Sequence, residues 1–244
     1  MDEIKRYKCV VSYDGSNYNG FQSQNNSIQK VIELALSKLT NSKIKIYASG
    51  RTDAKVHAYG QVFHFETDKQ FNDLKHSINA LLPNDIYVND VTEVSEQFHA
   101  RFSAKGKHYD YLINNGVYQP TLRNYCCYVD KKLDIKKMKE AASVFIGTHD
   151  FTSFNATKID EIADQVRTIS MICINEENNG MIRISFYGDG FLRYMVRMIS
   201  KAIIDAGLSK ISPQQLVQML ETKDKNACSF NGEPQGLYLV EVYY

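Results

Sequence analysis

Several residue types are scarce or absent in this sequence. It has no tryptophan, only four prolines and only five cysteines among 244 residues. The number of cysteines is odd, Cys126 is adjacent to Cys127, and no C-x-x-C pair occurs. This pattern argues against a disulfide framework and against a structural zinc site, so we expect reduced thiols.

Long apolar runs are also missing. The chain has no stretch of eighteen apolar residues, and Met1-Asp2-Glu3-Ile4-Lys5-Arg6 lacks the basic-then-apolar order of a leader peptide. The hydrophobic share of 43% and the charged share of 23% are typical of a soluble globular protein. We therefore expect a cytoplasmic protein with no membrane partner, folded as one large domain or as two of ordinary size.

The charges nearly cancel, with 29 Lys and Arg against 28 Asp and Glu and a net charge of +1. The whole chain therefore lacks the strongly basic balance of many nucleic-acid-binding proteins. Eight cations nevertheless fall in or beside the polar motifs described below: Arg51, Lys55, Arg101, Lys105, Lys107, Arg193, Arg197 and Lys201. If they converge, with the acids of 85–96 and 160–164 on another face, they form a positive cleft for phosphates. The alternative is solvated charge scattered over the surface.

Residues 1–104 predict an α+β unit. Lys8–Tyr13 is a short strand, and Ser27 caps a helix whose apolar residues follow the i, i+3, i+4 pattern, namely Ile28, Val31, Ile32, Ala35, Leu36 and Leu39. Strands at 43–48 and 61–67 flank a polar loop. A second helix around 74–82 ends at Pro83, and an extended segment, 85–94, follows.

Residues 105–244 predict a second α+β unit. Strands are expected at 107–114, 166–175, 181–187 and 237–243, with a hairpin turn at Asn178-Asn179-Gly180. Helices are expected after Asp134, at 191–206, and after Ser212, which has capping-box spacing and Pro213 at the first helical position. Antiparallel-type strands combined with helices in both halves favour α+β over a doubly wound parallel sheet. No Pro/Gly/Ser-rich linker marks the boundary after residue 104.

The polar loop from Ser49 to Ala58 carries one carboxylate, Asp53. A cation two residues earlier, Arg51, can hold that carboxylate ionised, and an ionised carboxylate can act as a nucleophile or a base. The alternative is an Asx turn closed by Asp53, with Arg51 as its surface partner. His57 and His64 follow, but no Cys or carboxylate lies at metal-ligand spacing around them, so we expect no metal.

The loop sequence Gly50-Arg51-Thr52-Asp53-Ala54, with Val56-His57-Ala58, resembles the catalytic signature of the tRNA pseudouridine synthase A family. Further blocks follow in the family's order over almost the whole chain: Tyr13-Asp14-Gly15 with Gly20-Phe21-Gln22-Ser23-Gln24, Phe98-His99-Ala100-Arg101-Phe102-Ser103-Ala104, Lys107-His108-Tyr109-Asp110-Tyr111, His149-Asp150-Phe151-Thr152-Ser153-Phe154, Gly190-Phe191-Leu192 with Met195-Val196-Arg197, and Gly236-Leu237-Tyr238-Leu239.

The resemblance implies a cofactor-independent isomerase that converts uridine to pseudouridine in the anticodon stem-loop of tRNA, at the family's tRNA positions 38–40. It implies that Asp53 is the nucleophile and that Arg51 helps to extrude the target nucleotide. It also implies that Tyr109 stacks on the flipped uracil and that Arg197 pairs with Asp53. From the residues alone, Tyr109 can equally be a sheet-face residue and Arg197 an arginine that snorkels from an amphipathic helix.

The resemblance also implies an architecture. Both halves would be RNA-recognition-motif-like units whose antiparallel sheets join, with the catalytic cleft between them, and two chains would form a homodimer. The periodicity of the sequence supports the two units and carries no information on the dimer.

Three positions depart from the family pattern, and each adds positive charge. Lys55 and Lys201 stand where the family has Gly, and Arg193 replaces a commonly aromatic residue. A Lys at a position that needs positive φ would strain the backbone. These changes favour one alternative, the same reaction on a ribosomal RNA helix. Two further alternatives stay open: a non-catalytic RNA-binding protein that uses the aromatic and basic surface, and a metal-dependent nuclease, which would need a second carboxylate near Asp53.

Overall fold

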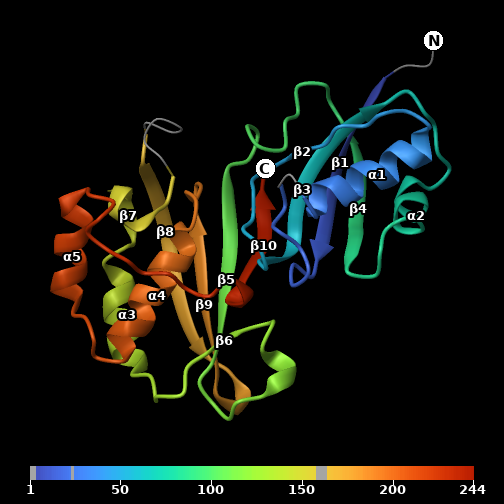
Figure 1. Ribbon diagram of the computed structural model, residues 1–244. Coiled ribbons are helices and arrows are strands. Elements are labelled where there is room, and N and C mark those ends of the chain that lie inside the picture. The colour runs from blue at the N-terminus through green and yellow to red at the C-terminus, as the bar shows by residue number, and fades with distance from the viewer. Residues whose placement is uncertain (1–3, 23–24, 158–163) are drawn as a thin grey trace. The chain divides into compact units, whose positions relative to one another are not determined.

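The computed structural model describes residues 4–22, 25–157 and 164–244 (Figure 1). Ser23 and Gln24 of the first motif, and residues 160–163 of the acidic stretch, lie outside the described residues. Tertiary contacts divide the chain into two compact units, Met1–Lys105 with Tyr238–Tyr244, and Gly106–Leu237. Both units combine helices with mostly antiparallel strands, so the predicted α+β class is confirmed.

The first unit is a sheet in the order β4-β1-β3-β10, with the short β2 also paired to β3. Its strands are β1 (Lys5–Tyr13), β2 (Tyr47–Ala48), β3 (His57–Thr67), β4 (Ile86–Val94) and β10 (Leu237–Tyr243). β1 is antiparallel to both β3 and β4, whereas β10 runs parallel to β3 with Tyr238 opposite His57. The chain's last strand therefore belongs with its first hundred residues, although the sequence-based division placed 237–243 in the second half.

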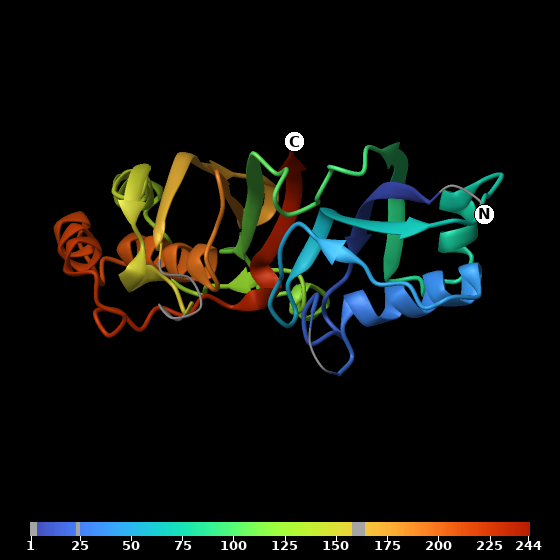
Figure 2. The same cartoon turned by 90° about the horizontal axis from the view of Figure 1, so that it is seen from above.

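Helix α1 (Ile28–Thr40) forms for the reasons that the sequence predicts. The Ser27 hydroxyl accepts a hydrogen bond from the Lys30 amide at 3.3 Å, and Asn41 closes the helix in the left-handed region. Ile28, Ile32 and Leu36 are fully buried. Figures 1 and 2 show α1 across one face of the sheet, with α2 (Leu74–Asn79) beside it.

The second unit pairs its strands antiparallel in the order β5-β9-β8-β7, with β6 parallel to β5. The strands are β5 (Gly106–Asn114), β6 (Cys127–Tyr128), β7 (Gly147–Asp150), β8 (Val166–Glu176) and β9 (Met181–Gly188). The predicted hairpin turn is present as a 3-10 turn at Asn178–Gly180 between β8 and β9. Three other 3-10 turns among the described residues are Pro120–Leu122, Thr152–Phe154 and Pro234–Gly236.

Three helices complete this unit: α3 (Ile135–Ser143), α4 (Met195–Gly207) and α5 (Pro213–Thr222). The predicted capping box of α5 is confirmed, since the Ser212 hydroxyl and the Gln215 side chain each bond to the other residue's backbone amide. The prediction for α4 began four residues too early. Tyr194 adopts a left-handed conformation (φ 63°) that cannot continue a right-handed helix, so α4 starts at Met195.

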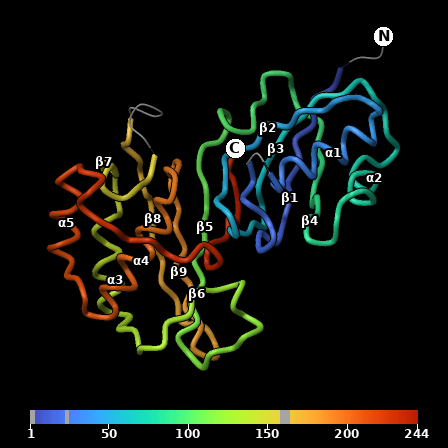
Figure 3. The backbone as a smooth tube through the Cα atoms, in the orientation of Figure 1, coloured from blue at the N-terminus to red at the C-terminus, as the bar shows by residue number. Residues whose placement is uncertain are grey.

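After α5 the chain runs as an extended segment past α4 to the 3-10 turn at Pro234–Gly236 (Figure 3). This segment, residues 223–236, is fixed along its length. The Asp224 amide donates to Ser153 Oγ at 3.0 Å, the Phe230 ring stacks on Phe154, and the Glu233 carbonyl accepts from the Tyr111 hydroxyl at 2.9 Å. This segment also surrounds Arg197, one of the candidate site residues.

Candidate active site

The loop that carries Asp53 connects β2 to β3, and its first part is anchored by one buried amide. Gln61 Oε1 accepts hydrogen bonds from the Ser49 hydroxyl at 2.7 Å and from the Val62 amide at 3.1 Å. Gln61 Nε2 donates to the Gly50 carbonyl at 3.1 Å. Because Gln61 is completely buried, these bonds have no competition from water. The loop leaves the sheet from a fixed position.

The middle of the loop rests on the first motif. The buried hydroxyls of Tyr13 and Thr52 are 2.7 Å apart, and the Phe21 amide donates to the Thr52 carbonyl at 3.1 Å. Gly20 has φ +97°, and a Cβ there would lie 2.5 Å from the Thr52 carbonyl oxygen. Only glycine fits this approach, which explains a glycine at this position of the motif.

Asp53 itself is half-buried, and Arg51 is exposed. The Asp53 carbonyl accepts from the Val56 amide at 3.2 Å, so a tight turn follows the carboxylate. Arg51 Nε donates to Gln22 Oε1 at 2.5 Å, which ties the exposed guanidinium to the first motif. The loop and the first motif therefore place Asp53 and Arg51 together in the first unit.

Lys55 occupies the left-handed region with φ 66°. The sequence predicts backbone strain at Lys55 if its φ is positive, because Lys stands where the family has Gly. The backbone does adopt this conformation, which favours Gly. A non-glycine residue in this region costs roughly 1 to 2 kcal/mol. The strain lies two residues after Asp53, in a turn fixed by the bond from the Lys55 amide to the Tyr18 carbonyl at 3.2 Å.

His57 is a positioning residue that the sequence considered only as a metal ligand. Its ring is buried and stacked on Tyr238 at 4.7 Å between centroids. Nδ1 accepts from the Gly15 amide at 3.1 Å and lies 3.2 Å from Asp14 Oδ1. His57 therefore joins the end of the Asp53 loop to the Tyr13-Asp14-Gly15 motif. Only the folded arrangement brings residues 14 and 57 together, so spacing along the chain gave no signal.

In the second unit, Tyr109 and Tyr111 project from β5 on one face, since they are two residues apart. Tyr109 is buried, and its ring meets Phe191 edge-on at 5.3 Å. Tyr111 is fully buried, and burial raises the pKa of its phenol well above the usual value. Tyr111 is therefore a structural hydroxyl that holds the Glu233 carbonyl.

Arg197 lies in the first turn of α4 and is also buried. Nε donates to the Gly232 carbonyl and Nη2 to Asn231 Oδ1, each at 2.8 Å, while the guanidinium lies 4.7 Å from the Tyr194 ring. A side chain with these contacts is not snorkelling, so that alternative is wrong. The extended segment 223–236 fixes the orientation of the guanidinium.

The two other added cations behave differently from each other. Arg193 is exposed, with its guanidinium 4.8 Å from the Tyr194 ring. Lys201 Nζ donates to Asp205 Oδ2 at 2.5 Å, one turn along α4. The charge of Lys201 is therefore compensated locally.

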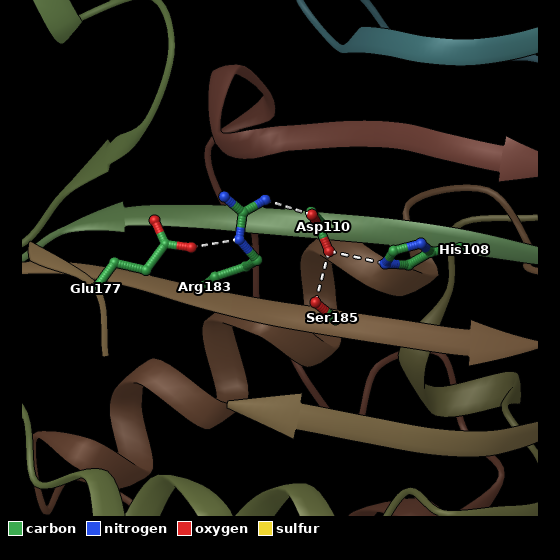
Figure 4. Close-up of polar contacts among 5 residues, drawn as sticks. All are labelled: His108, Asp110, Glu177, Arg183 and Ser185. Carbon is green, nitrogen blue, oxygen red and sulfur yellow. Dashed lines mark hydrogen bonds and ion pairs between the residues drawn. The ribbon is translucent and has the colours of Figure 1, made fainter. Parts of the chain in front are cut away.

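The sequence gave no separate role to Asp110, which is the centre of a polar network on β5 and β9 (Figure 4). Asp110 Oδ1 accepts from the Ser185 hydroxyl at 2.6 Å and lies 2.9 Å from His108 Nε2. Oδ2 accepts from Arg183 Nη1 at 2.5 Å, and Arg183 Nε donates to Glu177 Oε1 at 2.6 Å. The bonds to Glu177 and Asp110 raise the pKa of Arg183. Strand alternation places this network on the face of β5 opposite Tyr109.

The candidate residues thus fall in two pairs. Asp53 and Arg51 lie in the first unit, and Tyr109 and Arg197 lie in the second. Across the described part of the chain, no group of three His, Cys, Asp or Glu residues has a metal-binding arrangement. All five cysteines are free thiols. Within the same residues, every helix is too short or too polar to cross a membrane.

Comparisons with known proteins point to one family. A family model described as tRNA pseudouridine synthase matches residues 9–103 and 141–244. The tRNA pseudouridine synthase A of Thermoanaerobacter sp. strain X514 is 40% identical over 246 residues, which cover 99% of this chain and 100% of that protein. The protein of the same name from Bacillus subtilis strain 168 is 43% identical, with 98% and 99% covered. That from Exiguobacterium sp. strain AT1b is 42% identical, with 99% and 98% covered.

Proposed function

Because this chain belongs to the tRNA pseudouridine synthase family, we propose that it is an isomerase that converts uridine to pseudouridine in the anticodon stem-loop of tRNA. The observation that carries the proposal is Asp53, a half-buried carboxylate on a loop that is anchored at both ends. A carboxylate on a fixed loop suits a nucleophile, because the position of its backbone is set before the substrate arrives.

The reaction breaks the bond between ribose C1′ and uracil N1, rotates the base, and joins uracil C5 to C1′. The proton of C5 is lost and N1 gains a proton, so the product is an isomer of the substrate and no redox partner is required. Asp53 would act through an adduct at C1′, through an adduct at uracil C6, or as a base that gives a glycal. All three routes require its carboxylate.

Arg51 would help to extrude the target nucleotide, a step that costs a few kcal/mol for a stacked base. Its exposure and its bond to Gln22 support this role, because the guanidinium is at the surface and already oriented. Tyr109 would stack on the flipped uracil and receive the C5 proton. Arg197 would pair with Asp53 and keep it ionised. The fixed orientation of its guanidinium supports a role that needs one direction of approach.

These roles require the two units to enclose a common cleft, with their sheets joined, and we include that architecture in the proposal. The first unit has the element order β1-α1-β2-β3-α2-β4, with β4, β1 and β3 adjacent. This β-α-β-β-α-β order supports the likeness to an RNA-recognition motif. A homodimer acting in the cytoplasm completes the proposal. Exposed tyrosines on strands of the first sheet, Tyr59 and Tyr87, support a contact between copies.

The test is incubation of the purified protein, without added metal, with unmodified tRNA and ribosomal RNA transcripts. Pseudouridine is mapped by primer extension after carbodiimide treatment, beside Asp53→Asn. We expect stops in the tRNA anticodon arm with the wild type and none with the variant. Stops only in ribosomal RNA would mean that the substrate is ribosomal RNA and not tRNA. If there are no stops and RNA binding survives Asp53→Asn, a binding protein is favoured. Loss of activity with a chelator would point to the nuclease alternative.

A further inference from the structure

A series of aromatic rings lies at the β2 edge of the first unit, and the proposed chemistry does not use it. Tyr47 stacks on His64 at 5.2 Å, His64 meets His99 at 4.7 Å, and His99 meets Phe102 at 4.4 Å between ring centroids. Two of these rings are open to solvent: Tyr47 is 44% exposed and Phe102 is 78% exposed. We refer to these four side chains as the ring series.

Cations flank both ends of the ring series. Lys45 Nζ lies 5.2 Å from the centre of the Tyr47 ring, and the Arg101 guanidinium lies 6.0 Å from that of Phe102. The adjacent acid Glu66 is bound to Arg6, so its charge is balanced. The surface therefore combines aromatic faces with positive charge.

The exposure of Phe102 is imposed by the fold. Its turn is closed by hydrogen bonds from the Ser103 amide to the His99 carbonyl at 2.9 Å and from the His99 amide to Ser103 Oγ at 3.0 Å. The Ala100 amide also donates to Nδ1 of the buried His64 at 3.1 Å. An apolar ring held outward by so many bonds is preorganised for a partner.

The two histidines keep the interior of the series uncharged at neutral pH. Burial, together with the nearby His99 and Arg6, lowers the pKa of His64 to about 4. Burial, Arg6 and Arg101 lower the pKa of His99 as well. The imidazoles therefore act as neutral aromatic rings, and the positive charge is confined to Lys45 and Arg101.

We propose that the ring series, with Lys45 and Arg101, binds an unpaired base of the substrate RNA and its phosphate, at a place separate from the uridine that is isomerised. Aromatic faces with flanking cations are the chemistry that recognises unstacked bases. This inference rests on the proposed function for the presence of RNA. A second copy of the chain fits less well, because a two-fold contact sets a patch against itself and brings its cations together.

The separation of the ring series from Asp53 follows from the strand register and the chain length. The Asp53 loop enters β3 at His57, whereas Tyr47 pairs with His64, seven residues further along β3. At about 3.3 Å per residue, His57 and His64 lie roughly 23 Å apart along β3, and the six residues from Tyr47 to Asp53 span at most about 20 Å. The bound base would therefore come from another part of the RNA than the target uridine.

The test compares Phe102→Ala and Tyr47→Ala with Tyr118→Ala, an aromatic residue of the second unit that is 50% exposed and lies outside the series. Dissociation constants for a tRNA transcript are measured in an Asp53→Asn background, and single-turnover rates at saturating RNA in the wild-type background. We expect the first two variants to weaken binding between about 5-fold and 150-fold, the range of one base stack, with the saturated rate unchanged. Tyr118→Ala and Phe102→Trp should bind as the parent does.

A second measurement locates the base. Irradiation of the complex with ultraviolet light, followed by trypsin and mass spectrometry, should attach a nucleotide other than the target uridine to peptide 102–105. Equal affinity of Phe102→Ala and the parent would reject the site, while pseudouridine formation by the wild type would leave the proposed function intact. A lower mass of Phe102→Ala in sedimentation equilibrium would instead identify an interface between copies and overturn RNA binding. If the wild type forms no pseudouridine, the proposed function fails on its own measurement.

Discussion

At the scale of single residues, Lys55 carries the clearest conflict between local preference and fold. Its φ of 66° favours glycine, and Lys55→Gly removes roughly 1 to 2 kcal/mol of strain while adding about 0.5 to 1 kcal/mol of unfolded-state entropy. We expect Lys55→Gly to raise the free energy of unfolding by about 0.5 kcal/mol. Urea unfolding followed by circular dichroism measures this change.

The matched control is Ala54→Gly at the neighbouring exposed position, whose φ is not in the left-handed region. That change carries only the entropic cost, so it should lower the stability. Equal losses in both variants would show that Lys55 is not strained.

The same scale shows what sequence can anticipate about the site. The position of Asp53 between two strands and the Ser27 cap follow from local composition and were predicted, whereas the expected strain at Lys55 was implied by the resemblance to a family that has Gly there. The roles of Gln61 and His57 were not, because each depends on partners that approach only after folding: Gly50 for Gln61, and Gly15 for His57.

At the scale of elements, the hydrogen bond between Tyr13 of β1 and Thr52 of the catalytic loop couples a rigid strand to the nucleophile. Tyr13→Phe leaves the Thr52 hydroxyl buried without this partner, at a cost of about 1 to 3 kcal/mol in unfolding free energy. We also expect the single-turnover rate to fall by about 10- to 100-fold, since a small displacement of a nucleophile is costly. The dissociation constant for tRNA should stay unchanged.

The double variant Tyr13→Phe/Thr52→Val separates this coupling from general damage. It removes both polar groups, so the stability should partly recover relative to Tyr13→Phe, whereas the rate should not. Strictly additive losses of stability would contradict a direct bond between the two hydroxyls.

Element boundaries were predictable where a cap defines them and unpredictable where backbone conformation does. The Ser212 capping box gave the start of α5 correctly. The start of α4 was placed at Phe191 because apolar spacing continues through residues 191–195, and periodicity does not register the left-handed Tyr194.

At the scale of the whole molecule, the last residues of the chain bind to the end of its first unit. The Tyr244 hydroxyl donates to the Ala100 carbonyl at 2.7 Å, and the Lys105 amide donates to the Tyr243 carbonyl at 2.8 Å. The parallel pairing of Leu239 with Ala58 joins residues far apart in sequence. No local pattern encodes such a contact, which is why a division at one point after residue 104 assigned 237–243 to the other half.

Charge is the other property of the whole molecule, because a net charge of +1 provides little general attraction for RNA. Binding should therefore depend on individual contacts, and the logarithm of the association constant should fall with the logarithm of the salt concentration, with a slope of about 0.7 to 0.9 for each phosphate contact.

We expect Lys55→Gly to reduce this slope by the amount of about one phosphate contact. Lys201→Ala, which removes the same charge from a lysine already bonded to Asp205, should leave the slope unchanged. Filter binding of a tRNA transcript over a potassium chloride series measures both slopes. Equal reductions would mean that total charge, and not the exposed cation beside Asp53, governs the salt dependence.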